Sequence, residues 1–147
     1  MNLLDVNNLT VSFPSGDSSS FDAVRYLTFS IKNGETLCLV GESGSGKSLT
    51  ALAIMGLLPD SSTLSGTISF EGNAVATPGF HTRGHRFCGA GMSMIFKEPT
   101  AALNPTMRIR DILLEALRFK KGLSGAGAME RAKEALHAAG IEDTEAA

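Results

Sequence analysis

GESGSGKS, the stretch at residues 41–48, has the form G-x-x-x-x-G-K-S and decides the fold of this chain. The apolar run Leu37–Val40 precedes it and a helix-like segment follows it, so we predict a strand, a tight loop and a helix in this order. This context is typical of a phosphate-binding loop. The alternative is a glycine-rich turn that binds nothing, which the agreement of strand, spacing, Lys-Ser pair and helix disfavours.

Each residue type in this loop has a physical reason to be there. The glycines allow backbone angles closed to other residues, so that successive N–H groups can turn inward around phosphate oxygens. A helix opening near Gly46 adds its positive end. The Lys47 ammonium can reach the β- and γ-phosphates, and the Ser48 hydroxyl can ligate Mg²⁺. The candidate phosphate-binding residues are therefore Gly41, Glu42, Ser43, Gly44, Ser45, Gly46, Lys47 and Ser48.

The composition favours one soluble domain. The 147 residues carry 13 basic and 15 acidic side chains, a net charge of −2, which disfavours binding to nucleic acid or to an anionic membrane. No apolar run approaches the roughly 20 residues of a membrane span, and the polar alternation of residues 1–13 does not fit a signal peptide. We expect a cytosolic chain in which Cys38, in a buried strand, and Cys88, in a loop, are reduced and structural.

Alternating apolar residues predict strands in the first 40 residues. Leu4 and Val6 share one phase and Leu9, Val11 and Phe13 share the opposite one, so we expect a strand with a bulge at Asn7-Asn8. A polar loop at 14–20 and a strand at 27–32 follow, and Asn33-Gly34 predicts a turn. Residues 36–40 lack alternation, which is typical of a central strand covered on both faces.

A buried helix is predicted over residues 47–58, because it is apolar nearly all round, and Pro59 should end it. Residues 67–70 and 74–75 form a predicted hairpin around Glu71-Gly72. The next segment holds His81, Arg83, His85 and Arg86, which fit a solvated loop better than a metal site. Met92–Phe96 is a second candidate core strand.

Two amphipathic helices are predicted in the last third of the chain. Apolar residues at 109, 112, 113, 116 and 117 have helical spacing, and those at 129, 132, 136 and 139 repeat it. Lys120–Gly127 is expected to be a basic, glycine-rich linker between these helices. Gly140 is well placed as the residue that ends the second helix.

With these landmarks in place, the sequence resembles the nucleotide-binding subunit of an ABC transporter, and is most similar to the ATPases of bacterial oligopeptide and dipeptide importers. The resemblance rests on LLDVNNLTVSF at 3–13, LVGESGSGKS at 39–48, SGTISFEG at 65–72 and MIFKEPTAALNP at 94–105. It implies an α/β P-loop NTPase fold of the ABC type, present here as one incomplete domain over residues 1–147. Residues 1–106 would form the antiparallel β subdomain and P-loop core, and 107–147 the beginning of the helical subdomain.

The resemblance also implies roles for single residues. It makes Gly41–Ser48 the Walker A motif, with Thr50 close behind it on the same helix. Phe13 would be the aromatic residue that stacks on adenine. The equally favoured alternative is that Phe13 is a core residue that continues the first strand. Lys97 falls where the family places the glutamine of the Q-loop, which helps to bind Mg²⁺ and couples ATP to the membrane partner. A cation there departs from the family pattern.

The function implied by the resemblance is binding of ATP and Mg²⁺ to power uptake of peptides or similar solutes. The implied partners are transmembrane permease subunits and a second ATP-binding subunit, which would hold the chain at the inner face of the membrane without inserting it.

These residues contain no counterpart of four family features: the signature motif, the Walker B aspartate, the catalytic glutamate and the switch histidine. The stretch LSGAG at 123–127 only imitates the signature. We therefore assign no catalytic residue and expect ATP binding without hydrolysis by this chain alone. The alternatives are a non-catalytic or decayed nucleotide-binding module and a different P-loop enzyme, such as a small-molecule kinase or a GTPase.

Overall fold

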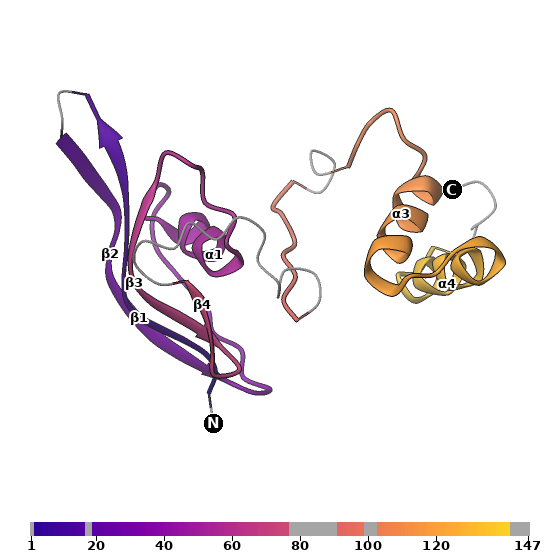
Figure 1. Cartoon of the computed structure of the whole chain (residues 1–147), viewed down its shortest axis with the longest axis horizontal. Coiled ribbons are helices and arrows are strands. Elements are labelled where there is room, and N and C mark those ends of the chain that lie inside the picture. Colours follow the sequence, from indigo (N-terminus) through magenta and orange to yellow (C-terminus); the bar gives the residue numbers. More distant parts are fainter. Residues whose placement is uncertain (1, 17–18, 77–90, 99–102, 142–147) are drawn as a thin grey trace. The chain divides into compact units, whose positions relative to one another are not determined.

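Two compact units, Met1–Ser93 and Met94–Ala147, make up the chain. The computed structural model describes residues 2–16, 19–76, 91–98 and 103–141 of them (Figure 1). Unit 1 contains the candidate phosphate-binding loop, and unit 2 contains Lys97 and two helices. The subdomain boundary expected at residue 106 stays a prediction.

Unit 1 is built on a four-stranded antiparallel sheet with the strand order β2-β1-β3-β4. The strands are β1 (Asn2–Ser15), β2 (Ser19–Lys32), β3 (Thr63–Phe70) and β4 (Asn73–Ala76). The predicted antiparallel subdomain, the hairpin around Glu71-Gly72 and the turn at Asn33-Gly34 are confirmed. The predicted loop at 14–20 was too long, because pairing of Phe13 with Phe21 continues both strands to Ser15 and Ser19.

The bulge predicted in β1 is confirmed. The pairing of β1 with β2 shifts register between Val6 and Leu9, and Asn8 has a φ of 50°. One extra residue reverses the alternation of side chains along a strand. For this reason the apolar residues on both sides of the bulge are buried in the same core. They are Leu4 and Val6 before it and Leu9 and Val11 after it.

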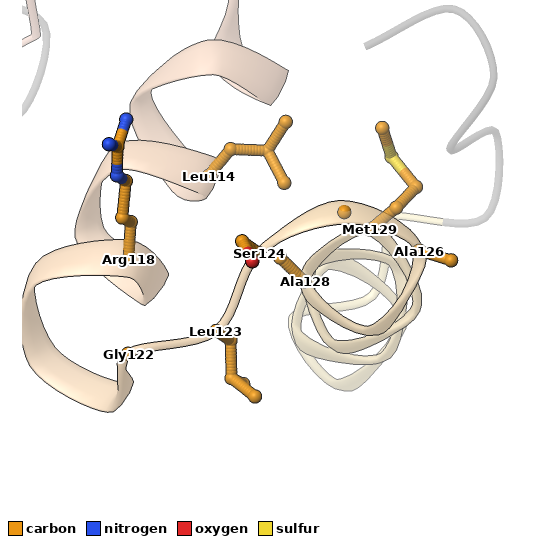
Figure 2. A pocket seen from close by; sticks show the side chains of 9 residues that line it. Leu114, Arg118, Gly122, Leu123, Ser124, Ala126, Ala128 and Met129 are labelled. Carbon is orange, nitrogen blue, oxygen red and sulfur yellow. The ribbon is translucent and has the colours of Figure 1, made fainter.

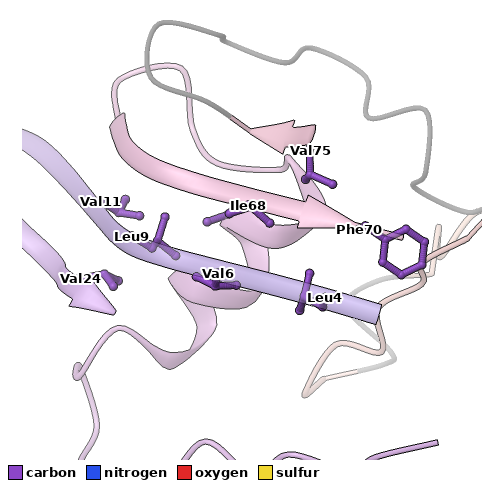
Figure 3. Close-up of a cluster of buried hydrophobic side chains, with 9 residues drawn as sticks. Leu4, Val6, Leu9, Val11, Val24, Ile68, Phe70 and Val75 are labelled. Carbon is purple, nitrogen blue, oxygen red and sulfur yellow. The ribbon is translucent and has the colours of Figure 1, made fainter. Parts of the chain in front are cut away.

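A helix, α1 (Lys47–Met55), lies beside the sheet (Figure 1), and its Ala53 belongs to this core. The labelled core side chains in Figure 3 come from all four strands of the sheet. The helix ends earlier than predicted, because Gly56 adopts the left-handed conformation, and the Gly56 N–H then bonds to the Ala53 carbonyl at 3.1 Å. Pro59 therefore does not end it. Of the residues in α1, only Thr50, Ala53 and Met55 are fully buried, so the expectation of an all-round buried helix was wrong.

Neither predicted central strand is a strand among the described residues. Residues 36–40 have no ladder partner and are exposed, so the interpretation of Cys38 as a buried structural residue is wrong. In 92–96, Met92 alone makes a bridge, and Ile95 is 94% exposed. The described sheet is wholly antiparallel and offers neither segment the parallel neighbours that a central strand requires. Cys88 and the His81–Arg86 segment lie outside the described residues.

Unit 2 contains α3 (Ile109–Lys121) and α4 (Gly125–Ala138), which confirms both predicted helices. The predicted linker was too long, because Lys120 and Lys121 belong to α3 and residues 125–127 belong to α4; only 122–124 connect them. Gly140, with a φ of 81°, follows α4 as predicted, and the Ile141 N–H reaches back to the Leu136 carbonyl at 3.0 Å. None of the helices in the described ranges has the length and apolar character needed to cross a membrane.

Candidate nucleotide-binding site

The loop 41–46 leads directly into α1, as the sequence predicts. Gly44 and Gly46 have positive φ angles of 82° and 87°, and the Ser45 N–H bonds to the Glu42 carbonyl at 3.2 Å. Gly46 is the buried N-cap of α1. A Cβ atom at Gly46 would lie 2.6 Å from the carbonyl oxygen of Ala23 and 2.9 Å from Cγ2 of Val24. The end of the loop is therefore seated against β2, where only glycine fits.

The N-terminus of α1 is open to an anion. Gly46 makes no side-chain cap, and the first turn carries no acidic residue. The first N–H groups of a helix lack partners within the helix, and the helix dipole places partial positive charge there. Residues 41–45 beside this end are exposed. The backbone thus supplies both donors and positive potential at one exposed place, which is what a phosphate group requires.

Lys47 folds back over the loop. Its Nζ atom donates to the carbonyl oxygen of Gly41 at 2.8 Å, to that of Glu42 at 2.6 Å and to Oγ of Ser45 at 3.2 Å. The ammonium charge is therefore held against residues 41–45 of the loop. Backbone and lysine together concentrate positive charge at the position where the sequence predicts phosphate.

Two hydroxyl groups follow Lys47 in α1, and they differ in exposure. Ser48 is exposed in the first turn of α1, and its role as a Mg²⁺ ligand stays a prediction. Thr50 is only 3% exposed, and its Oγ1 donates to the Gly46 carbonyl at 3.0 Å. Thr50 thus lies beneath the loop and fastens Gly46 to the helix. Its predicted nucleotide contact stays a prediction.

Phe13 has a partner that the sequence analysis missed. Its ring packs against the core and stacks on Phe21 of β2, with ring centroids 5.9 Å apart and planes at 26°. Phe21 is 54% exposed, so it presents an open aromatic surface. The two rings form one strand pair, which lies two pairs beyond the Val11–Val24 pair, and Val24 is the residue whose side chain approaches Gly46. Phe21 was missed because only the register of β1 with β2 shows that it lies opposite Phe13.

Lys97 belongs to unit 2 and is exposed at a bend in the chain. Its predicted Q-loop role stays a prediction. Unit 2 also contains a cavity of about 660 Å³ between α3 and α4. Figure 2 shows Leu114 and Arg118 on α3 and Ala128 and Met129 on α4 around it. The signature-like stretch 123–127 forms the connection and the first turn of α4 beside this cavity.

A glycine-rich loop of the G-x-x-x-x-G-K-S form, which opens a helix and whose lysine bonds back to the loop, defines a P-loop nucleotide-binding protein. Residues 24–147 match the family described as ABC transporter. The chain belongs to this family, which confirms the resemblance and the P-loop NTPase fold class.

Several curated proteins are similar to the chain. It is 43% identical over 139 residues to the oligopeptide transport ATP-binding protein OppD of Salmonella typhimurium, an alignment that covers 92% of this chain and 40% of that protein. It is 38% identical to the dipeptide transport ATP-binding protein DppD of Lactococcus lactis, covering 97% of this chain and 41% of that protein. For the glutathione import ATP-binding protein GsiA of Shigella dysenteriae the identity is 40%, covering 92% of this chain and 22% of that protein. The chain thus spans less than half the length of these relatives.

Proposed function

We propose that the chain is the ATP-binding part of an ABC transporter that couples ATP binding and hydrolysis to uptake of peptides or similar solutes. The observation that carries the proposal is the Lys47 ammonium held over a glycine-rich loop at the open N-terminus of α1. The names of the relatives, which describe ATP-binding proteins of oligopeptide, dipeptide and glutathione transport, support the choice of nucleotide and solute class.

The described residues fit a phosphate chain with its metal. The N–H groups of the loop and of the first turn of α1 would surround the phosphate oxygens, and Lys47 would neutralise the β- and γ-phosphates. The exposed Ser48 hydroxyl would be the protein's ligand to Mg²⁺. When bound, Mg²⁺ supplies further positive charge to the phosphates. Glu42 and Ser43, which are exposed, would contribute their backbone N–H groups.

The adenine ring would lie against the aromatic pair on β1 and β2. Phe13 is the residue that the family resemblance indicates, and Phe21 supplies the more exposed ring of the stacked pair. A base stacked on an aromatic side chain gains about 1–3 kcal/mol. The pair therefore adds a preference for a nucleotide over a bare phosphate chain.

The partners of the complete transporter are proposed from the family. Permease subunits and a second ATP-binding subunit would hold the chain peripherally at the inner face of the membrane, with Lys97 at the coupling position. The chain by itself would bind ATP without hydrolysing it. Phosphoryl transfer to water needs a residue that orients the water, and the sequence has no apolar run ending in Asp-Glu to supply one.

Calorimetric titration of the chain with ATP, with and without Mg²⁺, tests the proposal. The wild-type chain is expected to bind ATP more tightly when Mg²⁺ is present, and Ser48→Ala should lose most of that difference. Ser61→Ala, which changes an exposed serine in a turn after α1, is the matched control and should titrate like wild type. Absence of ATP binding by the wild-type chain would refute the proposed function.

A further inference from the structure

The Lys47 ammonium uses all of its hydrogen-bonding capacity inside its own loop. A lysine ammonium has three N–H donors and no acceptor. In this structure the three acceptors are the Gly41 carbonyl, the Glu42 carbonyl and the Ser45 hydroxyl. If the loop binds phosphate as proposed above, Lys47 must exchange at least one of these bonds for a bond to a phosphate oxygen.

The three bonds are not equally easy to exchange. The bonds to the Gly41 and Glu42 carbonyls measure 2.8 and 2.6 Å, and their acceptors belong to the backbone of the loop. The bond to Ser45 Oγ is longer, at 3.2 Å, and its acceptor is the only side chain of the three. A hydroxyl can turn away by rotation about one bond, whereas a carbonyl moves only with the loop. The Ser45 bond is therefore the weakest and the most easily released.

The loop also has the space that this contact requires. A Cβ atom at Gly41 would lie 2.6 Å from Ser45 Oγ, but 3.4 Å from Ser45 Cβ. The absence of a side chain at Gly41 is thus what allows the Ser45 hydroxyl to turn toward Lys47. The contact between Ser45 and Lys47 therefore depends on the residue at position 41 as well as on Ser45.

We propose that Ser45 is a positioning residue whose hydroxyl competes with phosphate oxygens for the Lys47 ammonium. All three donors of this ammonium are bonded within the loop, so a phosphate oxygen must displace one acceptor, and the Ser45 hydroxyl is the most easily displaced. Its removal should tighten phosphate binding by the worth of one exchanged hydrogen bond, about two- to tenfold.

Calorimetry with inorganic triphosphate, which lacks the base, measures this competition in the full chain. Ser45→Ala is expected to bind triphosphate about two- to tenfold more tightly than wild type. Ser61→Ala again serves as the control and should bind triphosphate like wild type. Equal or weaker binding by Ser45→Ala would overturn the proposal.

Nitrogen NMR of the Lys47 ammonium tests the contact without any ligand. The wild-type chain should show a Lys47 ammonium signal protected from rapid proton exchange, and Ser45→Ala should lose part of that protection, since the two carbonyl bonds remain. Identical signals in the two proteins would overturn the proposal. A wild-type chain that binds neither ATP nor triphosphate would instead refute the proposed function, while the ligand-free NMR result would still decide whether Ser45 holds Lys47.

Discussion

Replacing Gly46 by alanine should disrupt both the fold of unit 1 and the phosphate site. At a φ of 87° a side chain costs about 1–2 kcal/mol of backbone strain. The new Cβ would also lie 2.6 Å from the Ala23 carbonyl oxygen, a backbone atom that cannot rotate away. Overpacking of this kind costs a further 1–3 kcal/mol or so. Together, Gly46→Ala should lower the free energy of unfolding by about 2–5 kcal/mol.

Gly44→Ala is the matched control for this prediction. Gly44 has nearly the same φ, 82°, but a Cβ there meets nothing within 4 Å. It should cost the backbone strain alone, about 1–2 kcal/mol. Urea unfolding followed by circular dichroism measures both variants, and with ordinary urea dependence the midpoint of Gly46→Ala should lie about 1 M below that of Gly44→Ala. Equal midpoints would show that the loop is not seated on β2 as described.

Three further perturbations test other parts of the account. Lys97→Gln should make ATP binding more dependent on Mg²⁺, since a cation at the Q-loop position would repel the metal ion; identical Mg²⁺ titrations of the two proteins would contradict this role. Phe21→Leu should weaken ATP binding about fivefold or more while leaving triphosphate binding unchanged, whereas Phe119→Leu, at an exposed ring of unit 2, should change neither. Val40 and Ile95 are 89% and 94% exposed, so replacing both with lysine should reduce aggregation of the isolated chain, as measured by light scattering. Greater aggregation of this variant would show that these two side chains do not cause it.

Local features of the fold could be predicted from the sequence because their causes are local. The bulge in β1 follows from a change in apolar phase at Asn7-Asn8, and α3 and α4 follow from apolar residues at helical spacing. The loop and the start of α1 were predictable for the same reason, since glycine positions and the lysine determine them within eight residues. The end of α1 was misjudged because Gly56 offered a helix stop before Pro59.

Features that depend on distant partners could not be predicted in this way. The apolar residues of 36–40 fit a central strand, but a strand also needs hydrogen-bonded neighbours, and the described sheet provides none for it. The exposed ring of Phe21 became visible only when β1 and β2 were paired in register. The three hydrogen bonds of Lys47 depend on how the loop closes on itself, which the G-x-x-x-x-G-K-S pattern does not specify.

The central claim is that Lys47 and its loop form a nucleotide phosphate site, and calorimetry of Mg-ATP binding to Lys47→Ala tests it most directly. The variant should bind Mg-ATP at least about tenfold more weakly than wild type, because it loses charge-assisted hydrogen bonds to phosphate. Lys121→Ala, which removes a cation at the end of α3 in unit 2, should keep the wild-type affinity. Equal affinities of wild type and Lys47→Ala for Mg-ATP would contradict the claim.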